Sequence, residues 1–154
     1  MTNEFVLEAI TREFPESVIS HSEPYDFLTL EIKKEDIKKV IHHLRDSSLE
    51  INFLTDICGI HYPENLEKEI GVIYHLHNMM TNFRIRLKVF MPKENAEIDS
   101  MTALYAGANW MERETFDFYG VKFKDHPDLR VILNTEDLGY HPMLKEYPLE
   151  DGTR

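Results

Sequence analysis

The spacing of apolar and polar residues predicts regular elements over most of the first part of the chain. Apolar residues recur every three or four positions over 3–13 and 35–46, a pattern typical of amphipathic helices. Alternating or short apolar runs predict strands at residues 17–22, 27–32, 51–61, 71–77 and 83–90. Gly59 lies inside the third run and predicts a β-bulge. The order α-β-β-α-β-β-β predicts an α+β domain of two layers, with helices on one face of a sheet.

The pattern changes after this domain, which we expect to occupy residues 1–92. Residues 93–106 are predicted to be a linker with one apolar anchor, Tyr105. The last unit, 107–154, begins with a short helix that ends at Gly120, a residue type that tolerates the left-handed conformation at a helix end. The fold class is therefore a two-layer α+β domain followed by a C-terminal helix and an extended tail.

The segment after Gly120 shows little helical or strand periodicity. A compact domain seldom carries so long an irregular segment unless that segment is disordered or functional. Its apolar content argues against disorder. The large apolar residues are Phe123, Leu129, Val131, Ile132, Leu133, Tyr140, Leu144 and Tyr147, and the prolines are Pro127, Pro142 and Pro148. We therefore expect the tail to become ordered by lying on another protein.

Composition narrows the classes of function. The formal net charge of −11 argues against binding to nucleic acid or to an anionic lipid surface. A single cysteine, Cys58, cannot form an internal disulfide or hold an iron–sulfur cluster alone, and is expected to be buried in a reducing compartment. We expect no signal peptide, since the N-terminus lacks a basic start and apolar core, and no membrane-spanning segment, since no apolar run is long enough.

The predicted helix 107–119 combines aromatic residues on several faces with a dense set of charges. Its carboxylates need arginines or backbone N–H groups from elsewhere, because a buried unpaired carboxylate is costly. Arg113 and Asp117 are four residues apart and are expected to pair. A catalytic role for Glu112, Glu114 and Asp117 is disfavoured, because Glu112 and Glu114 lie on opposite sides of the helix and no nucleophile motif accompanies them.

Histidines offer a different hypothesis, a small metal-dependent enzyme that uses His61, His75 and His77. The neighbouring strand carries a basic row that opposes a cation on the same face: Arg84, Arg86 and Lys88. We interpret that row as the solvated face of an antiparallel strand. A third hypothesis is a free-standing adaptor whose tail binds an unrelated protein.

The residues from Trp110 onward resemble a known family. The motif comprises Trp110–Glu114, Phe116–Val121, Phe123, His126–Arg130 and Ile132-Leu133. The ending Gly139–Pro148 is similar to the family's G-x-H-P-L-R-K-D-Y-P. Together they resemble the thirty-kilodalton subunit of respiratory complex I, which in bacteria is the C subunit of NADH-quinone oxidoreductase. The chain departs from that ending at Leu144, where the family commonly has Arg, and at Glu146, where it has Asp.

The resemblance implies a non-catalytic subunit in the peripheral arm of a proton-translocating NADH:quinone oxidoreductase. The implied partners are the hydrogenase-like large subunit, which helps form the quinone pocket, and the small subunit with the last iron–sulfur cluster. The complex uses NADH, FMN, iron–sulfur clusters and quinone, none of them bound by this chain. The implied location is the cytoplasmic side of the cell (inner) membrane, where the complex holds the subunit. Similar subunits serve membrane hydrogenases, the photosynthetic NDH complex and a deazaflavin-dependent dehydrogenase.

The resemblance and the residue patterns together predict an interface with those partners and no catalytic, cofactor-binding or metal-binding residue. The predicted interface residues are Trp110, Glu112, Arg113, Glu114, Asp117, Tyr119, Phe123, His126, Pro127, Asp128, Arg130, His141, Pro142, Lys145 and Tyr147.

Overall fold

The computed structural model describes residues 1–147, so the predicted role of Pro148 lies outside the described residues. The helices are α1 (Asn3–Glu13), α2 (Ile37–Asp46) and α3 (Ala108–Tyr119). The strands are β1 (Val18–Ser22), β2 (Thr29–Ile32), β3 (Phe53–His61), β4 (Ile70–Asn78), β5 (Phe83–Met91), β6 (Glu97–Asp99) and β7 (Lys122–Lys124). Short 3₁₀ turns lie at Pro24–Asp26 (η1), Leu66–Lys68 (η2) and Lys93–Asn95 (η3).

Five strands form one sheet in the order β1-β2-β5-β4-β3. The β2–β5 pair is parallel and the other pairs of this sheet are antiparallel. Along β5, Ile85, Leu87 and Val89 are fully buried, whereas Arg84 is exposed and Lys88 half-buried. One face of the sheet therefore meets the core and the other remains open. This arrangement confirms the predicted two-layer α+β fold.

The helices bury their apolar stripes against the inner face of the sheet. The predicted stripe of α2, namely Ile37, Val40, Ile41 and Leu44, is fully buried in one cluster with the inward-facing strand residues. Thr2 caps α1 through its side-chain oxygen, which accepts a hydrogen bond from the Phe5 N–H, 3.3 Å away. Among residues 1–147, no helix is long and apolar enough to cross a lipid bilayer.

The region predicted as a linker contains a strand instead. β6 pairs in parallel with β7, and Ile98 lies opposite Phe123 in this two-stranded sheet. Both side chains are buried in the same cluster as the main sheet, together with Val121 and Leu144. Three-residue strands give too few positions to show alternation, so the pattern did not predict them. The second half of the chain thus completes the core of the first.

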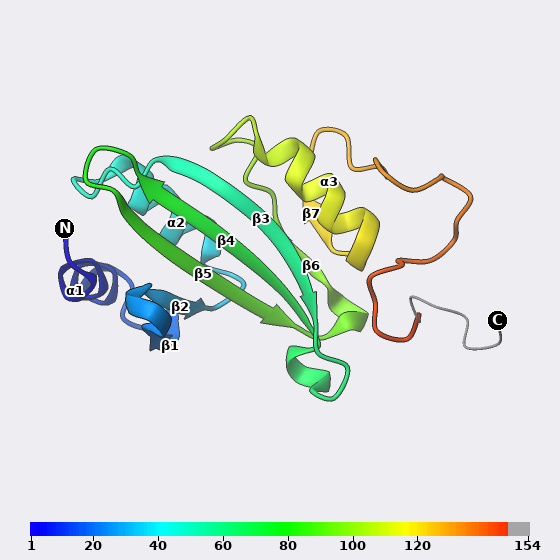
Figure 1. The fold of residues 1–154 in the computed structure, drawn as a ribbon, viewed down its shortest axis with the longest axis horizontal. Helices are drawn as coiled ribbons and strands as arrows, with labels where there is room; N and C mark the ends of the chain where they lie inside the picture. The colour runs from blue at the N-terminus through cyan, green and yellow to red at the C-terminus, as the bar shows by residue number, and fades with distance from the viewer. Residues whose placement is uncertain (148–154) are drawn as a thin grey trace.

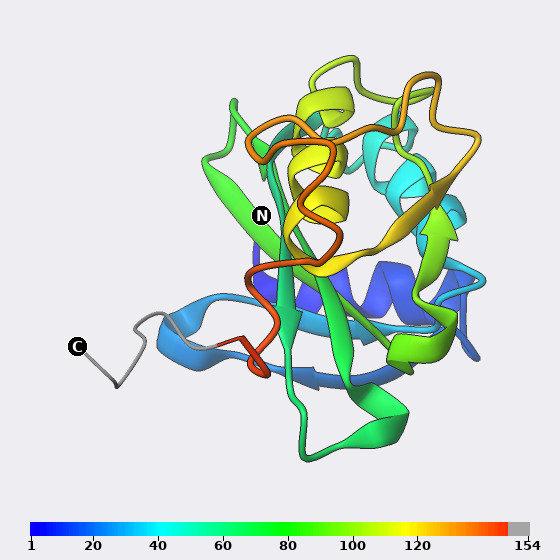
Figure 2. The same ribbon diagram turned by 90° about the vertical axis from the view of Figure 1, so that its right-hand side faces the viewer.

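The tail runs along α3 on the side that faces away from the five-stranded sheet, as Figures 1 and 2 show from two directions (orange to red). The segment predicted to be irregular after Gly120 contains the strand β7, but from Asp125 to Tyr147 it has turns and bends and no helix or strand. Its backbone returns to β3 at its end, because the Lys145 N–H donates to Nδ1 of His61, 2.9 Å away. Gly120 ends α3 in the left-handed conformation, with φ of 77°.

Candidate interaction surface

Asp117 organises the middle of the tail from inside α3. Its Oδ2 accepts hydrogen bonds from the N–H groups of Ile132, Leu133 and Asn134 at 3.0, 2.8 and 3.0 Å. Its Oδ1 accepts from Nδ2 of Asn134 at 2.8 Å. Burial raises the pKa of Asp117, but these hydrogen bonds outweigh it and hold the pKa below its ordinary value. The carboxylate is therefore ionised and fixes the path of residues 132–134.

Arg113 holds the preceding residues of the tail. Its Nε donates to the carbonyl oxygen of Arg130 and its Nη2 to that of Val131, both at 3.1 Å. Its guanidinium carbon lies 5.2 Å from the ring centroid of Trp110, a cation–π contact. Among residues 1–147, Arg113 makes no ion pair with Asp117, contrary to the predicted pair. Both side chains bind the tail backbone instead.

Glu112 lies on the inner side of α3 and is fully buried. Its Oε2 accepts from the Ser100 hydroxyl at 2.7 Å and its Oε1 from the Met101 N–H at 2.6 Å. Burial raises the pKa of Glu112 to about 7, although both hydrogen bonds act in the opposite direction. Nε2 of His126 lies 4.0 Å from Oε2 of Glu112, and both side chains are wholly enclosed.

Both histidines of the tail, His126 and His141, form hydrogen bonds through their ring nitrogens. Nδ1 of His126 accepts from the Asp128 N–H at 3.0 Å, so its proton sits on Nε2, which faces the Asn109 carbonyl oxygen at 3.1 Å. Nδ1 of His141 donates to the Asp117 carbonyl oxygen at 2.9 Å. The ring of His141 also covers Gly120, where an added Cβ would lie 2.7 Å from its Cδ2. Both histidines therefore attach the tail to α3.

The structure divides the predicted interface residues into two groups. The enclosed or half-buried residues are Glu112, Arg113, Asp117, Tyr119, Phe123, His126, His141 and Pro142. The exposed residues are Trp110, Glu114, Pro127, Asp128, Arg130, Lys145 and Tyr147. The carboxylates expected to need partners from elsewhere, Glu112 and Asp117, find them within the chain. Because these two residues are at most 1% exposed, they cannot contact a partner directly and instead hold the backbone of the neighbouring segments in place.

Several large apolar side chains of α3 and the tail are exposed, and we call them together the α3–tail surface. Its members are Trp110, Leu133, Tyr140, Met143 and Tyr147. Trp110 is 61% exposed and Leu133 is 64% exposed, large values for such residues in a segment whose backbone is fixed. The rings of Tyr140 and Tyr147 lie with their centroids 4.5 Å apart. The predicted interface did not include Leu133, Tyr140 or Met143, although large apolar residues in an aperiodic segment were the signal for them.

The three histidines of the metal hypothesis do not converge. His61 pairs with Ile70 and faces the core side of the sheet, whereas His75 and His77 lie opposite Arg86 and Arg84 on the open face. Side chains alternate between the two faces of a strand, so this difference in register separates them. In the described part of the chain, no group of three His, Cys, Asp or Glu side chains is arranged to bind a metal ion.

Two other sequence-based expectations concern β3. Gly59 pairs regularly with Val72, and the irregular register lies between Leu54 and Asp56, so the bulge predicted at Gly59 was wrong. Glycine is required there because an added Cβ would lie 2.3 Å from Cδ2 of Tyr119. Cys58 was expected to be buried but is only half-buried. Burial, with nearby Asp56, raises the pKa of its thiol to about 11.

A family comparison and a search for relatives identify the same protein family. Residues 30–153 match the family described as Respiratory-chain NADH dehydrogenase, 30 Kd subunit. The C subunit of NADH-quinone oxidoreductase from Geobacter metallireducens is 37% identical over 153 residues, which cover 99% of this chain and 93% of the relative.

Two solved structures share the fold. One, titled as the trypsin-resistant fragment (1-134) of Nqo5, is 28% identical with a TM-score of 0.72, over 84% of this chain and 100% of that one. The other is titled as a structure of the membrane-bound sulfane sulfur reductase, an archaeal respiratory membrane complex. It has a TM-score of 0.79 at 21% identity, over 95% of this chain and 85% of that one.

Proposed function

Because the chain belongs to the family of the 30 kDa subunit of respiratory-chain NADH dehydrogenase, we propose that it is a non-catalytic subunit of a proton-translocating NADH:quinone oxidoreductase. In this role it holds together the large subunit that helps form the quinone site and the small subunit with the last iron–sulfur cluster. NADH, FMN, the clusters and quinone are bound by other subunits. The complex holds the chain on the cytoplasmic side of the membrane.

The observation that carries this proposal is the α3–tail surface. Five large apolar residues are exposed on a segment whose backbone is fixed by Asp117, Arg113 and His61. Apolar side chains on a preorganised backbone favour association, because little conformational entropy is lost when the partner binds. Tryptophan and tyrosine are also enriched among residues that dominate interface energies. The buried polar contacts therefore hold the α3–tail surface in place, and its exposed aromatic residues bind the neighbouring subunits.

Surface substitutions test this proposal better than a truncation after Gly120. Such a truncation removes Val121 and Phe123, which are buried in the core. We expect the triple variant Trp110→Ala, Leu133→Ala and Met143→Ala to fold and to lose assembly into the complex. Loss of an interface anchor typically costs about 2 kcal/mol, or roughly 30-fold in affinity. Assembly is measured by native gel electrophoresis of membranes and by NADH:quinone reductase activity.

A matched control removes an exposed aromatic residue from the other end of the molecule. Tyr25 is fully exposed in the turn before β2, so Tyr25→Ala is expected to leave assembly unchanged. Full assembly and activity of the folded triple variant would contradict the proposed role of the α3–tail surface. Analysis of the co-purified subunits identifies the complex: bound FMN and NADH oxidation support the proposal, whereas hydrogenase activity in their place indicates a related membrane complex.

A further inference from the structure

The open face of the five-stranded sheet carries a row of basic side chains on β5. Arg84, Arg86 and Lys88 point to this face because they alternate with the buried Ile85 and Leu87. Among residues 1–147, none of the three lies within 4.0 Å of a carboxylate oxygen. The chain has 28 acidic residues against 17 basic ones, so a row of three cations without acidic partners does not follow from its composition.

Arg86 is held in place, unlike a freely solvated arginine. Its Nε donates to Nε2 of His75 at 2.9 Å, and its guanidinium carbon lies 4.8 Å from the ring centroid of Phe27. Phe27 and His75 are parallel, with an interplanar angle of 2°. Burial, followed by the nearby Arg86, lowers the pKa of His75, which keeps that ring neutral and able to accept. The Nη groups of Arg86 remain available in a fixed geometry that suits a carboxylate.

A hollow lies at each end of the basic row. Near Arg84, a hollow of about 390 Å³ is lined by Phe27, Asp56, His75 and His77. At the other end a hollow of about 440 Å³ lies beside Phe90. From Arg84 to Phe90 the strand rises about 20 Å. The face therefore has the length of about six residues of extended polypeptide.

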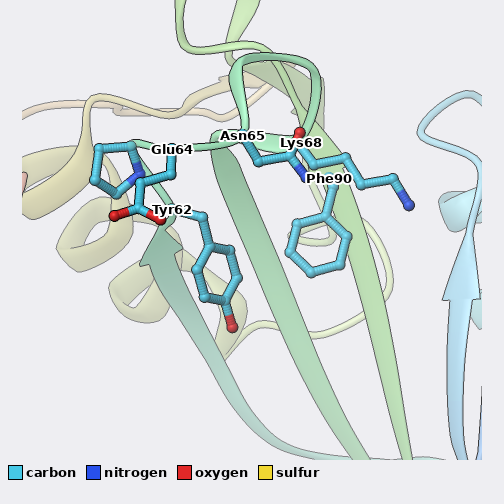
Figure 3. A pocket seen from close by; sticks show the side chains of 6 residues that line it. Tyr62, Glu64, Asn65, Lys68 and Phe90 are labelled. Atoms are coloured by element: carbon cyan, nitrogen blue, oxygen red, sulfur yellow. The ribbon is translucent and has the colours of Figure 1, made fainter.

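The second hollow is aromatic. Figure 3 shows the rings of Tyr62 and Phe90 lying over the strands, with their centroids 6.0 Å apart. Nζ of Lys68 lies 5.8 Å from the Phe90 ring centroid and pairs with Glu31. Glu64 also lines this hollow. Such a site accepts an apolar or aromatic side chain next to a charged one.

The carboxylates on the open face determine where an acidic partner could bind. Of its carboxylates, Glu31 is paired with Lys68, whereas Asp56 lies 3.8 Å from the neutral ring of His75, at the Arg84 end. Glu64 belongs to the aromatic end, so the centre of the face is basic. The rest of a chain with net charge −11 repels acidic polypeptides and leaves this row as the attractive position.

We propose that the open sheet face binds an extended acidic segment of a partner protein. Carboxylates of the segment bind Arg84, Arg86 and Lys88, and an aromatic side chain packs in the hollow lined by Tyr62 and Phe90. This surface lies on the open face of the sheet, whereas α3 packs on the opposite face, and the two adjoin at Asp56 on the edge of β3.

A defined peptide tests the proposal with the full chain. The probe is a fluorescein-labelled octapeptide of alternating glutamate and tyrosine, and the comparison peptide has glutamine in place of glutamate. Fluorescence anisotropy should show binding of the acidic peptide, which weakens as salt rises, and at least tenfold weaker binding of the neutral one. Binding should shift the backbone NMR signals of β4 and β5.

Variants separate the charged and aromatic contributions. The pair Arg84→Gln and Lys88→Gln should weaken binding of the acidic peptide about tenfold and reduce its salt dependence. Tyr62→Ala should weaken binding and leave the salt dependence intact. The matched control, Arg12→Gln with Lys33→Gln, removes two exposed basic residues elsewhere and should change affinity less than twofold.

Several results would overturn the proposal. They are an absence of binding to the unaltered chain, equal affinity for the acidic and neutral peptides, and equal weakening by the control pair. Displacement of the peptide by inorganic phosphate at equal concentration would instead identify a simple anion site. Unfolding curves of each variant show whether a loss of binding reflects a loss of folding, and Tyr62→Ala, on a loop, still tests the aromatic hollow in that case.

Discussion

Two carboxylates on α3, Glu112 and Asp117, are both buried but have opposite shifts of their pKa values. Asp117 accepts four hydrogen bonds, three of them from backbone N–H groups, so its charged form is stabilised. Among the described residues Glu112 accepts two, from Ser100 and Met101, and the effect of burial on its pKa is the larger one. The number of donors that the fold supplies therefore decides the charge on each side chain.

The raised pKa of Glu112 predicts a pH dependence of stability. Between its ordinary pKa of 4.5 and its value of about 7 in the folded chain, Glu112 ionises more readily in the unfolded chain. Its contribution to the free energy of unfolding is therefore present below pH 4.5 and is lost as the pH rises through 7. We expect Glu112→Gln to reduce the decline in unfolding free energy between pH 5 and 7.5 by on the order of 2 kcal/mol.

Urea unfolding at these two pH values measures the effect, and Asp117→Asn provides the comparison. Because the pKa of Asp117 is lowered, its carboxylate stays ionised throughout this interval. Asp117→Asn is expected to shift stability at both pH values alike. If the unfolding free energy of Glu112→Gln fell between pH 5 and 7.5 as much as that of the unaltered chain, Glu112 would not be the source of this pH dependence.

At the scale of elements, the contact of α3 with β3 depends on the absence of a side chain at Gly59. The Tyr119 ring lies where a Cβ of residue 59 would project. This close approach brings the C-terminal end of α3 against the sheet, so that the tail bound to Asp117 and Gly120 returns towards His61. The position of the α3–tail surface thus depends on one strand residue.

We expect Gly59→Ala to destabilise the chain by about 1–3 kcal/mol, because Tyr119 or the backbone must move. Gly107→Ala is the matched control. No atom lies within 4 Å of the position that its methyl group would take, and the φ of −65° at residue 107 suits alanine, so stability should stay equal or rise slightly. Unfolding by urea compares the two variants, and an equal effect of both would argue against the Tyr119 contact.

At the scale of the whole molecule, the boundary between core and tail lies after β7 rather than at Gly120. Val121 and Phe123 are buried in the main cluster, and β7 pairs with β6 across the predicted linker. Between residues 125 and 147, contacts to the core are made by the buried Leu144 and the half-buried Leu129, and the other side chains are exposed or half-buried. Within residues 1–147 there is therefore one core, to which the tail is attached by polar contacts and by Leu129 and Leu144.

Two truncations test this boundary. A chain that ends after Lys124 should keep a cooperative thermal transition at a lower temperature, because Asp117 loses its donors. A chain that ends after Gly120 should show none, since loss of a buried Phe alone costs about 3–5 kcal/mol out of a typical total of 5–15. Circular dichroism measures both transitions. Equal stability of the two chains would show that β7 does not belong to the core.

Much of the fold could be predicted from local pattern. The buried stripe of α2 and the alternation of β5 follow from periods of 3.6 and 2, which depend only on neighbouring residues. Gly120 was recognised as a helix end for the same local reason. The family was identified from the residues around Trp110 and His141, and the comparisons confirm that identification.

The contacts between distant residues were decided only by the tertiary structure. No local period shows that the carboxylate of Asp117 binds the N–H groups of residues 132–134, or that Ile98 lies opposite Phe123. Nor does it show that His61 faces the core while His75 faces away, since that depends on the register between β3 and β4. Sequence alone determined the helices and the strands of the main sheet, because their periods depend on nearby residues, but it missed the three-residue strands β6 and β7. Only the folded chain determined which charges are satisfied internally and which side chains remain exposed for a partner, because both depend on how distant segments pack.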